Sequence, residues 1–490
     1  MKKLFFFAVI MFTVYLSQAQ WQPDVKLTNS NAPSWTATNG NSKVIASKGD
    51  TLHVVWEDDR DGDGNGEVYY KRSTNCGVSW GPDTRLTNND SIKYDPSIVV
   101  SGSVLRVVWS DERDDTTGNH NAEIYYKSST DGGMSWGPDT RLTFADGGSE
   151  SPSMAVEDSV IHIVWYDYRN DTTGNEYTDI YYKRSMDSGL TWGPDIRLTS
   201  DPHNYYSGYP GVAVSGSVVH VVWEDARNGG TGDVYYKRST DGGSSWGPDT
   251  RLTEDTANSW DPCIALNNDT VRIVWEDDRD GNFEIYYKQS TDGGLTWGPD
   301  TRLTNNPADS YYPTIAVSGS KLHIVWQDDR YGDYEIFYKE SLDGGVNWGA
   351  DTRLTNDLNG SYLAFVAVTD SAVHVVWEDN RTGDMEIYYK RNPTGNMPVG
   401  IGNDQTNDAG NGISIYPNPA SDLIHIALDN NLPGSETLSI RNILGEELLS
   451  RPVRNGETMI DVAGLQNGVY FIQVTADNKT GSSKKLIIAK

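Results

Sequence analysis

The sequence is poor in cysteine, in basic residues and in long apolar segments. Only Cys76 and Cys263 occur among 490 residues, and they occupy non-equivalent positions in different repeats. A disulfide framework is therefore excluded, and the fold must be held by its core. Lys and Arg number 40 against 69 Asp and Glu, giving a net charge of −29, which argues against nucleic acids as partners. No segment after residue 20 is long and apolar enough to predict membrane insertion.

The N-terminus has the pattern of a secretory signal peptide. Lys2 and Lys3 precede an apolar run over residues 4–16, and Ala19 ends a small-x-small cleavage site. We therefore expect residues 1–19 to be removed and the mature chain to leave the cytoplasm.

An internal repeat fills most of the remaining sequence. A Trp-x-Asp-x-Arg motif recurs every 51 to 58 residues. Each copy is followed by an (Ile/Val)-(Tyr/Phe)-Tyr-Lys run, a Ser-x-Asp-x-Gly-x-(Ser/Thr)-Trp box and an Asp-x-Arg-Leu-Thr segment. Each unit thus holds four short β-type runs separated by turn residues, which is the size of one propeller blade. Helical periodicity is absent, so the sequence predicts an all-β fold. The motif tryptophans are Trp56, Trp109, Trp165, Trp223, Trp275, Trp326 and Trp377.

The copy numbers predict how the ring of blades closes. The closing segment has an extra copy at residues 24–28 before the first unit, whereas the last unit stops near Arg391 without a box or closing segment. We therefore predict a seven-bladed β-propeller over residues 20–391. Its N-terminal strand supplies the outer strand of the seventh blade and thereby protects the free sheet edges.

The C-terminal quarter breaks the repeat. Residues 392–412 are rich in Gly, Asn, Asp and Pro and are interpreted as a linker. A new pattern begins at Ile413, and residues 413–490 are predicted to form a small β-sandwich domain.

Two family resemblances follow from these motifs. The repeated box, as in residues 290–297, resembles the Asp box of sialidases and related propellers, where it is a surface turn whose Asp bonds turn amides. The Tyr416-Pro417-Asn418-Pro419 segment and the following glycine motifs make residues 413–490 similar to the type IX secretion sorting domains of Bacteroidetes. The second resemblance implies passage across the outer membrane, engagement of the secretion machinery, and release from or anchoring at the cell surface.

Strand direction predicts where a ligand binds. The Trp-x-Asp-x-Arg loops and the crossovers between blades share one face, here called the crossover face, and the Asp boxes lie on the opposite face. Aromatic side chains beside carboxylates suit sugar rings, although each ring could instead pack between blades. The crossover candidates are Tyr94, Tyr209, Trp260, Tyr312 and Tyr362, with Tyr205, Tyr206 and Tyr311 nearby.

The repeated arginines are a second set of ligand candidates, as equivalent lectin-like pockets that would bind by multivalency. The alternative is an internal fork that bridges carboxylates such as Asp58 and Glu67 on adjacent strands. The seven arginines are Arg60, Arg113, Arg169, Arg227, Arg279, Arg330 and Arg381.

One loop resembles a calcium loop. Asp59, Asp61 and Asp63 alternate with other residues and are followed by glycine, so their oxygens could converge on Ca²⁺. A solvated acidic turn is the alternative.

Catalysis has little support in the sequence. Sialidase chemistry needs three arginines that grip a carboxylate, yet every arginine of the propeller falls in a repeated column, and the Arg-(Ile/Leu)-Pro element is absent. His120 and His203 are outside the repeat, and either could form a base–acid pair with Tyr205 or Tyr206 in a lyase.

We therefore expect a monomeric, secreted or surface-anchored propeller that binds an extracellular glycan without catalysis. A glycoside hydrolase or polysaccharide lyase, and a protein-interaction scaffold, are the alternatives.

Overall fold

The structure is a computed structural model of an all-β chain. No helix occurs in the described residues, and none could therefore cross a membrane there. The chain divides into two compact units, residues 1–397 and residues 398–490. The structure describes residues 21–488 apart from residues 31, 39, 62–63, 116–120, 172–173, 175–176, 201–204, 230–231, 255, 358, 397–412, 417–419, 421–422, 429–435, 443–446, 454–455, 467 and 477–478. The predicted signal peptide and most of the predicted linker lie outside the described residues.

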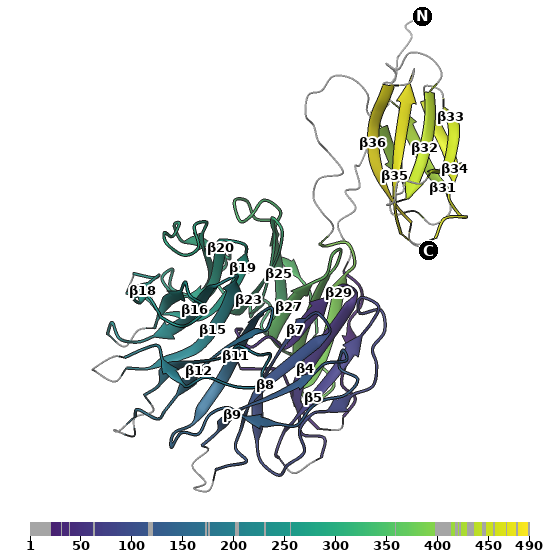
Figure 1. Cartoon of the computed structure of the whole chain (residues 1–490). Coiled ribbons are helices and arrows are strands. Elements are labelled where there is room, and N and C mark those ends of the chain that lie inside the picture. Colours follow the sequence, from purple (N-terminus) through teal and green to yellow (C-terminus); the bar gives the residue numbers. More distant parts are fainter. Residues whose placement is uncertain are drawn as a thin grey trace, which may run out of the picture. The chain divides into compact units, whose positions relative to one another are not determined.

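The described part of the first unit forms seven antiparallel sheets, which we number as blades 1 to 7. The innermost strand of each blade contacts that of the next, and the contact between β27 and β3 closes the ring. Figure 1 shows the sheets fanned around a central axis. The strands are β2 (Ser34–Trp35), β3 (Ile45–Lys48), β4 (Thr51–Asp58), β5 (Glu67–Ser73) and β6 (Thr84–Arg85) in blade 1; β7 (Lys93–Ser101), β8 (Val104–Asp111), β9 (Glu123–Ser129) and β10 (Thr140–Arg141) in blade 2; β11 (Ser149–Glu157), β12 (Val160–Asp167), β13 (Asp179–Ser185) and β14 (Ile196–Arg197) in blade 3; β15 (Ser207–Ser215), β16 (Val218–Asp225), β17 (Asp233–Ser239) and β18 (Thr250–Arg251) in blade 4; β19 (Ser259–Asn267), β20 (Thr270–Asp277), β21 (Glu284–Ser290) and β22 (Thr301–Arg302) in blade 5; β23 (Ser310–Ser318), β24 (Lys321–Asp328), β25 (Glu335–Ser341) and β26 (Thr352–Arg353) in blade 6; and β27 (Ser361–Val368), β28 (Val373–Asp379), β29 (Glu386–Asn392) and β1 (Val25–Lys26) in blade 7.

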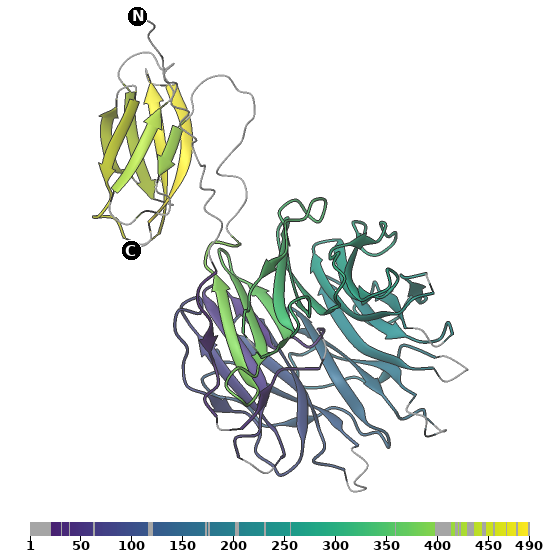
Figure 2. The same cartoon turned by 180° about the vertical axis from the view of Figure 1, so that it is seen from behind.

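The N-terminal strand closes the ring as the sequence predicts. Val25 of β1 pairs with Tyr389 of β29, and both views show the purple N-terminal segment beside the green last blade (Figure 1, Figure 2). Asp24 accepts from Arg381 at 2.8 Å and pairs with Lys390 at 2.8 Å. The closing segment therefore supplies both a strand and a carboxylate to blade 7.

The core lies between neighbouring blades. β-branched residues of the second and third strands fill it, and the seven motif tryptophans are at most 1% exposed. The repeated histidines are buried and hydrogen-bonded to tyrosines, for example His53 Nδ1 to Tyr70 Oη at 2.7 Å. Burial lowers the pKa of His53 to about 4, so these histidines are neutral core residues.

The Asp boxes are surface turns, as their resemblance implies. In blade 2, Asp131 accepts from the backbone amides of Met134 and Ser135, each at 2.9 Å, and from the Ser135 hydroxyl at 2.6 Å. The box tryptophan Trp136 packs edge-on against Tyr70 of blade 1 at 5.1 Å. Each box thus joins two blades.

The second unit contains two sheets that share one core, which confirms the β-sandwich. Ile424 and Ile460 on one sheet and Ile440 and Ile472 on the other belong to that core and are fully buried. The first sheet has β30 (Ile413–Tyr416), β31 (Leu423–Leu428) and β34 (Gly456–Asp461), and the second has β32 (Glu436–Asn442), β33 (Glu447–Val453), β35 (Gly468–Ala476) and β36 (Lys479–Ile488).

Candidate functional site

A row of cross-strand pairs marks the crossover end of the blades. In each blade, the residue between Trp and Asp of the repeated motif lies opposite a residue at the start of the inner strand. Most pairs place an aromatic ring beside a carboxyl or amide group, and blade 3 places its acid and its ring on the opposite strands from blades 1, 5, 6 and 7. We call these pairs the crossover row: Trp35–Glu57, Tyr94–Ser110, Glu150–Tyr166, Gly208–Glu224, Trp260–Glu276, Tyr311–Gln327 and Tyr362–Glu378.

The next residue of the inner strand occupies the left-handed backbone region at a β-bulge. Tyr209 and Tyr312 occupy this bulge position. Tyr94, Trp260 and Tyr362 lie one position earlier, in the crossover row. The five crossover aromatics are thus in two registers and not in one equivalent place. Such backbone is unusual for non-glycine residues and gathers at functional sites. The residues are Asp95, Ser151, Tyr209, Asp261, Tyr312 and Leu363, with φ between 44° and 53°.

The motif side chains of the crossover row connect adjacent blades. Glu224 accepts from the Asp261 amide at 3.2 Å, and Glu276 accepts from the Tyr312 amide at 2.8 Å. Ser110, Gln327 and Glu378 accept an inner-strand amide of the following blade in the same way. These bonds satisfy backbone groups that the bulge removes from the sheet.

Glu57 departs from this pattern. Its carboxyl group has no hydrogen bond or ion pair with any described residue, and the residue of the next blade at this place is Asp95, whose side chain is itself acidic. Gly66 leaves room for it, because a Cβ there would lie 2.3 Å from Glu57 Oε1. Among the described residues, the repeated interblade contact is therefore absent between blades 1 and 2, as it is between blades 3 and 4, where the motif residue Tyr166 donates to Glu150 of its own blade.

A pocket of about 220 Å³ opens at this boundary. Glu57, Asp95 and Glu378 bring three carboxyl groups to its wall, and Trp35 and Tyr94 bring two rings. Asp95 accepts from Thr38 N and Oγ1 at 2.8 Å and from Ser151 Oγ at 2.6 Å. Glu378 accepts from Thr36 N at 2.6 Å and Oγ1 at 2.7 Å. Two of the three carboxyl groups are thus fixed by donors, and the third is not.

Burial governs the protonation of these acids. Burial, followed by the nearby Asp95 and Glu378 carboxylates, raises the pKa of Glu57 to about 8. Burial likewise raises the pKa of Glu378 to about 7 and that of Glu276 to about 8. The crossover row therefore gains negative charge across the neutral pH range.

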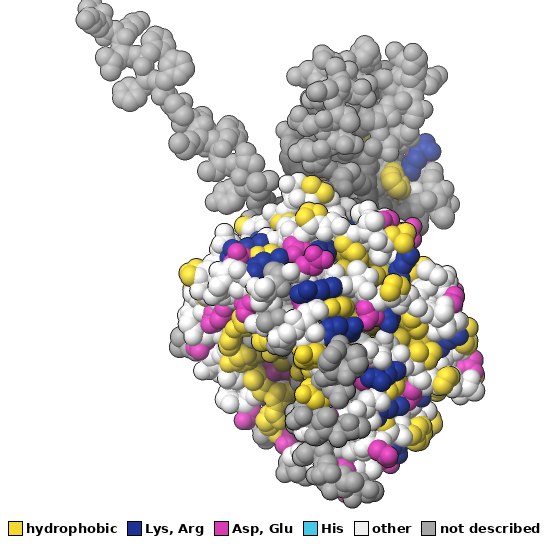
Figure 3. Space-filling model, turned by 90° about the vertical axis from the view of Figure 1, so that its left-hand side faces the viewer, with side chains coloured by type: hydrophobic (Ala, Val, Ile, Leu, Met, Phe, Trp, Pro, Cys, Tyr) yellow, Lys and Arg dark blue, Asp and Glu magenta, His cyan; other side chains and the backbone are white. Residues whose placement is uncertain are grey.

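A band of rings extends from the pocket across the later blades. Trp260, which is 37% exposed, stacks on Phe283 with 5.3 Å between the ring centroids. Phe283 contacts Tyr311 at 5.1 Å, and Tyr334 contacts Tyr362 at 5.6 Å. Figure 3 views this side of the molecule and shows a hollow bordered by yellow hydrophobic side chains, with acidic groups within it. The band can present ring faces to a ligand several sugars long.

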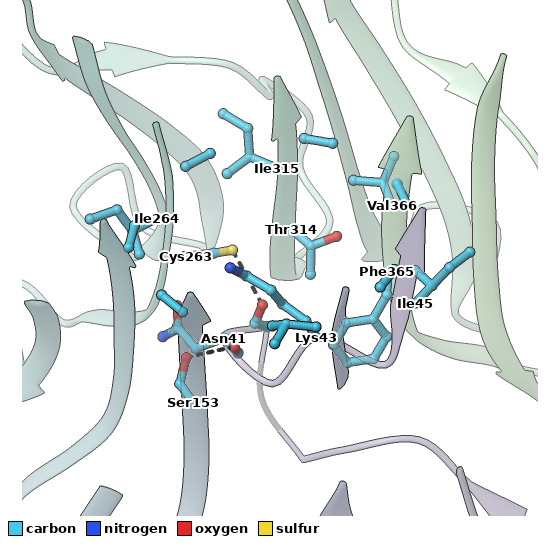
Figure 4. A pocket seen from close by; sticks show the side chains of 18 of the residues that line it. Asn41, Lys43, Ile45, Ser153, Cys263, Ile264, Thr314, Ile315, Phe365 and Val366 are labelled. Carbon is cyan, nitrogen blue, oxygen red and sulfur yellow. Dashed lines mark hydrogen bonds between the residues drawn. The ribbon is translucent and has the colours of Figure 1, made fainter. Parts of the chain in front are cut away.

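Residues 37–38 and 40–43 lie at the centre of the propeller, between β2 and β3 of the inner strand of blade 1. Asn41 donates to Tyr209 O at 2.9 Å, and Cys263 donates to Gly40 O at 3.2 Å. A Cβ on Gly40 would lie 2.8 Å from Pro313 O, so glycine is needed there. A second cavity, of about 390 Å³, lies along the inner strands (Figure 4).

Lys43 is the charged residue of this cavity. Its ammonium group points toward Cys263 (Figure 4) and has no hydrogen bond or ion pair in the part of the chain that the structure describes. Burial lowers the pKa of Lys43 and raises that of Cys263 to about 11. Burial therefore disfavours the charged form of both groups.

The seven candidate arginines are engaged inside their own blades. In blade 5, Arg279 donates from Nε and Nη2 to Asp277, each at 2.6 Å, and from Nη1 to Asp300 at 2.8 Å. Its guanidinium group lies 4.4 Å from the centroid of the Tyr286 ring. The predicted fork is present, but its second carboxylate precedes the outer strand. Glu284, which corresponds to the predicted partner, instead accepts from Arg302 at 2.6 Å.

The same network recurs in every blade. Each arginine donates from Nη1 to the closing-segment carboxylate and from Nη2 to the motif carboxylate, and the side chains of all seven are at most 24% exposed. The geometry therefore gives Arg60, Arg113, Arg169, Arg227, Arg279, Arg330 and Arg381 a role within the fold, and leaves the aromatic residues of the crossover row as the remaining candidates.

The calcium candidates have other partners. Asp59 accepts from the Gly64 amide at 2.9 Å, and Asp61 pairs with Arg85 at 2.8 Å. Asp63 lies outside the described residues. Across the described ranges, no three His, Cys, Asp or Glu side chains form a group that could hold a metal ion.

The lyase candidates are only partly described. His120 and His203 lie outside the described residues, and Tyr205 and Tyr206 are half-buried near the start of β15. Tyr206 lies in a tyrosine cluster, 6.4 Å from Tyr209. Burial and the Glu224 carboxylate raise the pKa of Tyr206 far above its ordinary value, which opposes its use as a base.

The acids of the crossover row were missed by sequence reasoning. Glu57, Glu224, Glu276 and Glu378 occupy the variable position of the repeated motif, and attention to its constant residues passed over them. The available signal was a polar residue near the end of an otherwise apolar strand.

Comparisons with known proteins identify the C-terminal unit. Residues 414–489 match the family described as the secretion system C-terminal sorting domain. The chain therefore carries a type IX secretion sorting domain, which implies a Bacteroidetes origin. This domain delivers the protein through the type IX machinery to the cell surface or the medium.

The propeller has more distant relatives. The chain is 27% identical over 194 residues to xyloglucanase Xgh74A of Acetivibrio thermocellus, across 36% of this chain and 22% of that enzyme. The chain thus matches about a fifth of the length of this curated relative. Polysaccharide lyase Uly1 is similar in structure, with a TM-score of 0.52, 11% identity and coverage of 76% of this chain and 98% of that one. A Trypanosoma rangeli sialidase covers 80% and 83% at 12% identity and a TM-score of 0.42.

Proposed function

We propose that this propeller binds an extracellular glycan on its crossover face without transforming it. The observation that carries the proposal is the crossover row, in which aromatic rings stand beside carboxyl and amide groups in blade after blade. Sugar rings stack their C–H faces on aromatic side chains, and their hydroxyl groups donate to carboxylates. Trp260 and Tyr362 are the stacking groups of the band, whereas Glu276 and Gln327 are buried and hold backbone amides of the next blade.

The exported location supports a glycan partner, because the sorting domain places the propeller where extracellular polysaccharides occur. The similarity to a xyloglucanase over 194 residues makes xyloglucan a reasonable first probe. Repetition supports binding over catalysis, since blades 1, 5 and 7 present the same aromatic–acid pair. A monomer with several such subsites would gain affinity along a polymer by multivalency.

The test is a glycan array that includes xyloglucan, followed by titration of the best ligand. We expect Trp260→Ala to weaken binding about tenfold, in line with the loss of one aromatic stacking contact. Leu295→Ala is the matched control, because Leu295 is 65% exposed on the Asp-box turn of the same blade. Absence of binding to every glycan on the array, or equal loss in both variants, would overturn the proposal.

A further inference from the structure

The pocket between blades 7, 1 and 2 contains a carboxyl group, that of Glu57, which has no hydrogen bond with a described residue. The other motif acids of the crossover row have such a bond. Three of the residues that line the pocket, Glu57, Asp95 and Glu378, are acids, and no Lys, Arg or His lines it. A buried carboxylate without a donor or a counter-ion is costly, and the cost is relieved when a cation arrives.

The nearest basic residue is already occupied. Lys93 acts on the Glu57 charge, but its ammonium group donates to Asn89 O at 2.6 Å and pairs with Glu67 at 3.2 Å. Lys93 is fully buried and does not line the pocket. The protein therefore supplies no cation of its own there.

The broken repeat points the same way. In blades 2, 4, 5, 6 and 7 the motif side chain accepts a backbone amide of the next blade. In blade 1 the motif residue is an acid, Glu57, but its carboxyl group makes no such contact with a described residue. Glu57 is half-buried and lines the pocket. No described residue donates to its carboxyl group, so a ligand that carries a donor can complete its hydrogen bonding.

The rings fix the shape of that ligand. Trp35 and Tyr94 line the same pocket as the three acids, so a ring with an apolar face and a positively charged substituent meets both kinds of wall. Aromatic faces also attract cations directly. A volume of about 220 Å³ is suited to one monosaccharide unit.

We propose that this pocket is a subsite for an amino sugar, whose protonated primary amine is held by Glu57, Asp95 and Glu378. The inference rests on the proposed glycan binding and narrows it to a class of ligand. The amine lies among the three carboxylates, the sugar ring stacks against Trp35, and the remaining units of the oligosaccharide follow the aromatic band.

The test compares two probes that differ only in the amine: a β-1,4-linked glucosamine tetrasaccharide and its fully N-acetylated counterpart, each titrated by calorimetry into the full chain. The titrations are made at a salt concentration that screens surface charge. We expect the amine form to bind about tenfold or more tightly, since a desolvated ion pair adds that much to a neutral contact.

Two variants locate the effect. Glu57→Gln should remove most of the preference for the amine form, and Asp158→Asn should leave it unchanged. Asp158 is an exposed residue of the β11–β12 turn on the Asp-box face, so it matches the change in charge without touching the pocket. Asp95→Asn provides a second variant, read by the same preference, should Glu57→Gln lose its fold.

The outcomes separate the inference from the proposed function. Equal binding of both tetrasaccharides would overturn the amino-sugar inference and leave glycan binding intact. Failure of both tetrasaccharides, with neutral glycans bound on the array, would have the same meaning. Failure of every glycan would overturn both. An equal loss of preference in Glu57→Gln and Asp158→Asn would show attraction by net charge alone and would also overturn the inference.

Discussion

Replacing Asp277 by alanine should lower the free energy of unfolding of the propeller by about 3–5 kcal/mol, the usual cost of breaking a buried ion pair by removing one partner. Asp277 is fully buried and accepts from Trp275 Nε1 at 2.8 Å, from Ser259 Oγ at 2.8 Å and from the Arg279 side chain. Truncation leaves the Trp275 indole N–H buried without a partner, which alone costs about 1–3 kcal/mol. The charge of Arg279 then has only Asp300.

The measurement is urea-induced unfolding followed by tryptophan fluorescence, with Asp269→Ala as the control. Asp269 is an exposed residue in the turn between β19 and β20 of the same blade, so its replacement should change the free energy of unfolding by less than about 0.5 kcal/mol. A loss below about 1 kcal/mol in Asp277→Ala, or equal losses in the two variants, would refute the structural role given to this network.

Three further predictions concern single residues. Glu57→Gln should raise the melting temperature at pH 8 and not at pH 4, because the pKa of Glu57 is raised from its ordinary value to about 8. The folded state therefore holds the proton more tightly than the unfolded state, and the stability conferred by this group is lost as pH rises from about 4.5 to 8. A melting temperature that is unchanged at both pH values would contradict this prediction. Lys43→Met should stabilise the protein by about 1–2 kcal/mol in urea, because burial lowers the pKa of Lys43 and the variant removes an unpaired amine from the central cavity; destabilisation would show that Lys43 has a partner in solution. Asp24→Ala should speed hydrogen exchange in β29 and β28 without a comparable change in β16, because Asp24 joins β1 to Arg381 and Lys390; uniform exchange across the blades would argue against a local role in closure.

The fold could be predicted because the repeat is explicit. The spacing of Trp-x-Asp-x-Arg motifs and the stray closing segment at residues 24–28 led to the pairing of Val25 with Tyr389. The site could be predicted only as a face. Strand direction placed the crossovers correctly, but Trp260 and Tyr312 differ by one residue in register. This difference could not be predicted, because the bulge that causes it has no sequence signature of its own.

The acids show why the remainder was hidden. Glu57 and Glu276 occupy the same column of the repeat and have the same residue type, yet one holds the Tyr312 amide and the other holds nothing. The two acids differ in their neighbours, which are Asp95 in one case and Tyr312 in the other. Such differences depend on side chains far apart in the sequence, so a column-by-column reading could not reveal them.

The pairing of β1 with β29 also sets when the ring of blades can close. The two strands are separated by more than 350 residues, and loop closure over such a length is entropically unfavourable until the intervening blades have formed. While the chain is being synthesised and translocated, the outer edge of the seventh blade does not yet exist, and the N-terminal strand has no partner. The ring can therefore be completed only after residues 386–392 have been synthesised, and the N-terminal strand stays unpaired until then.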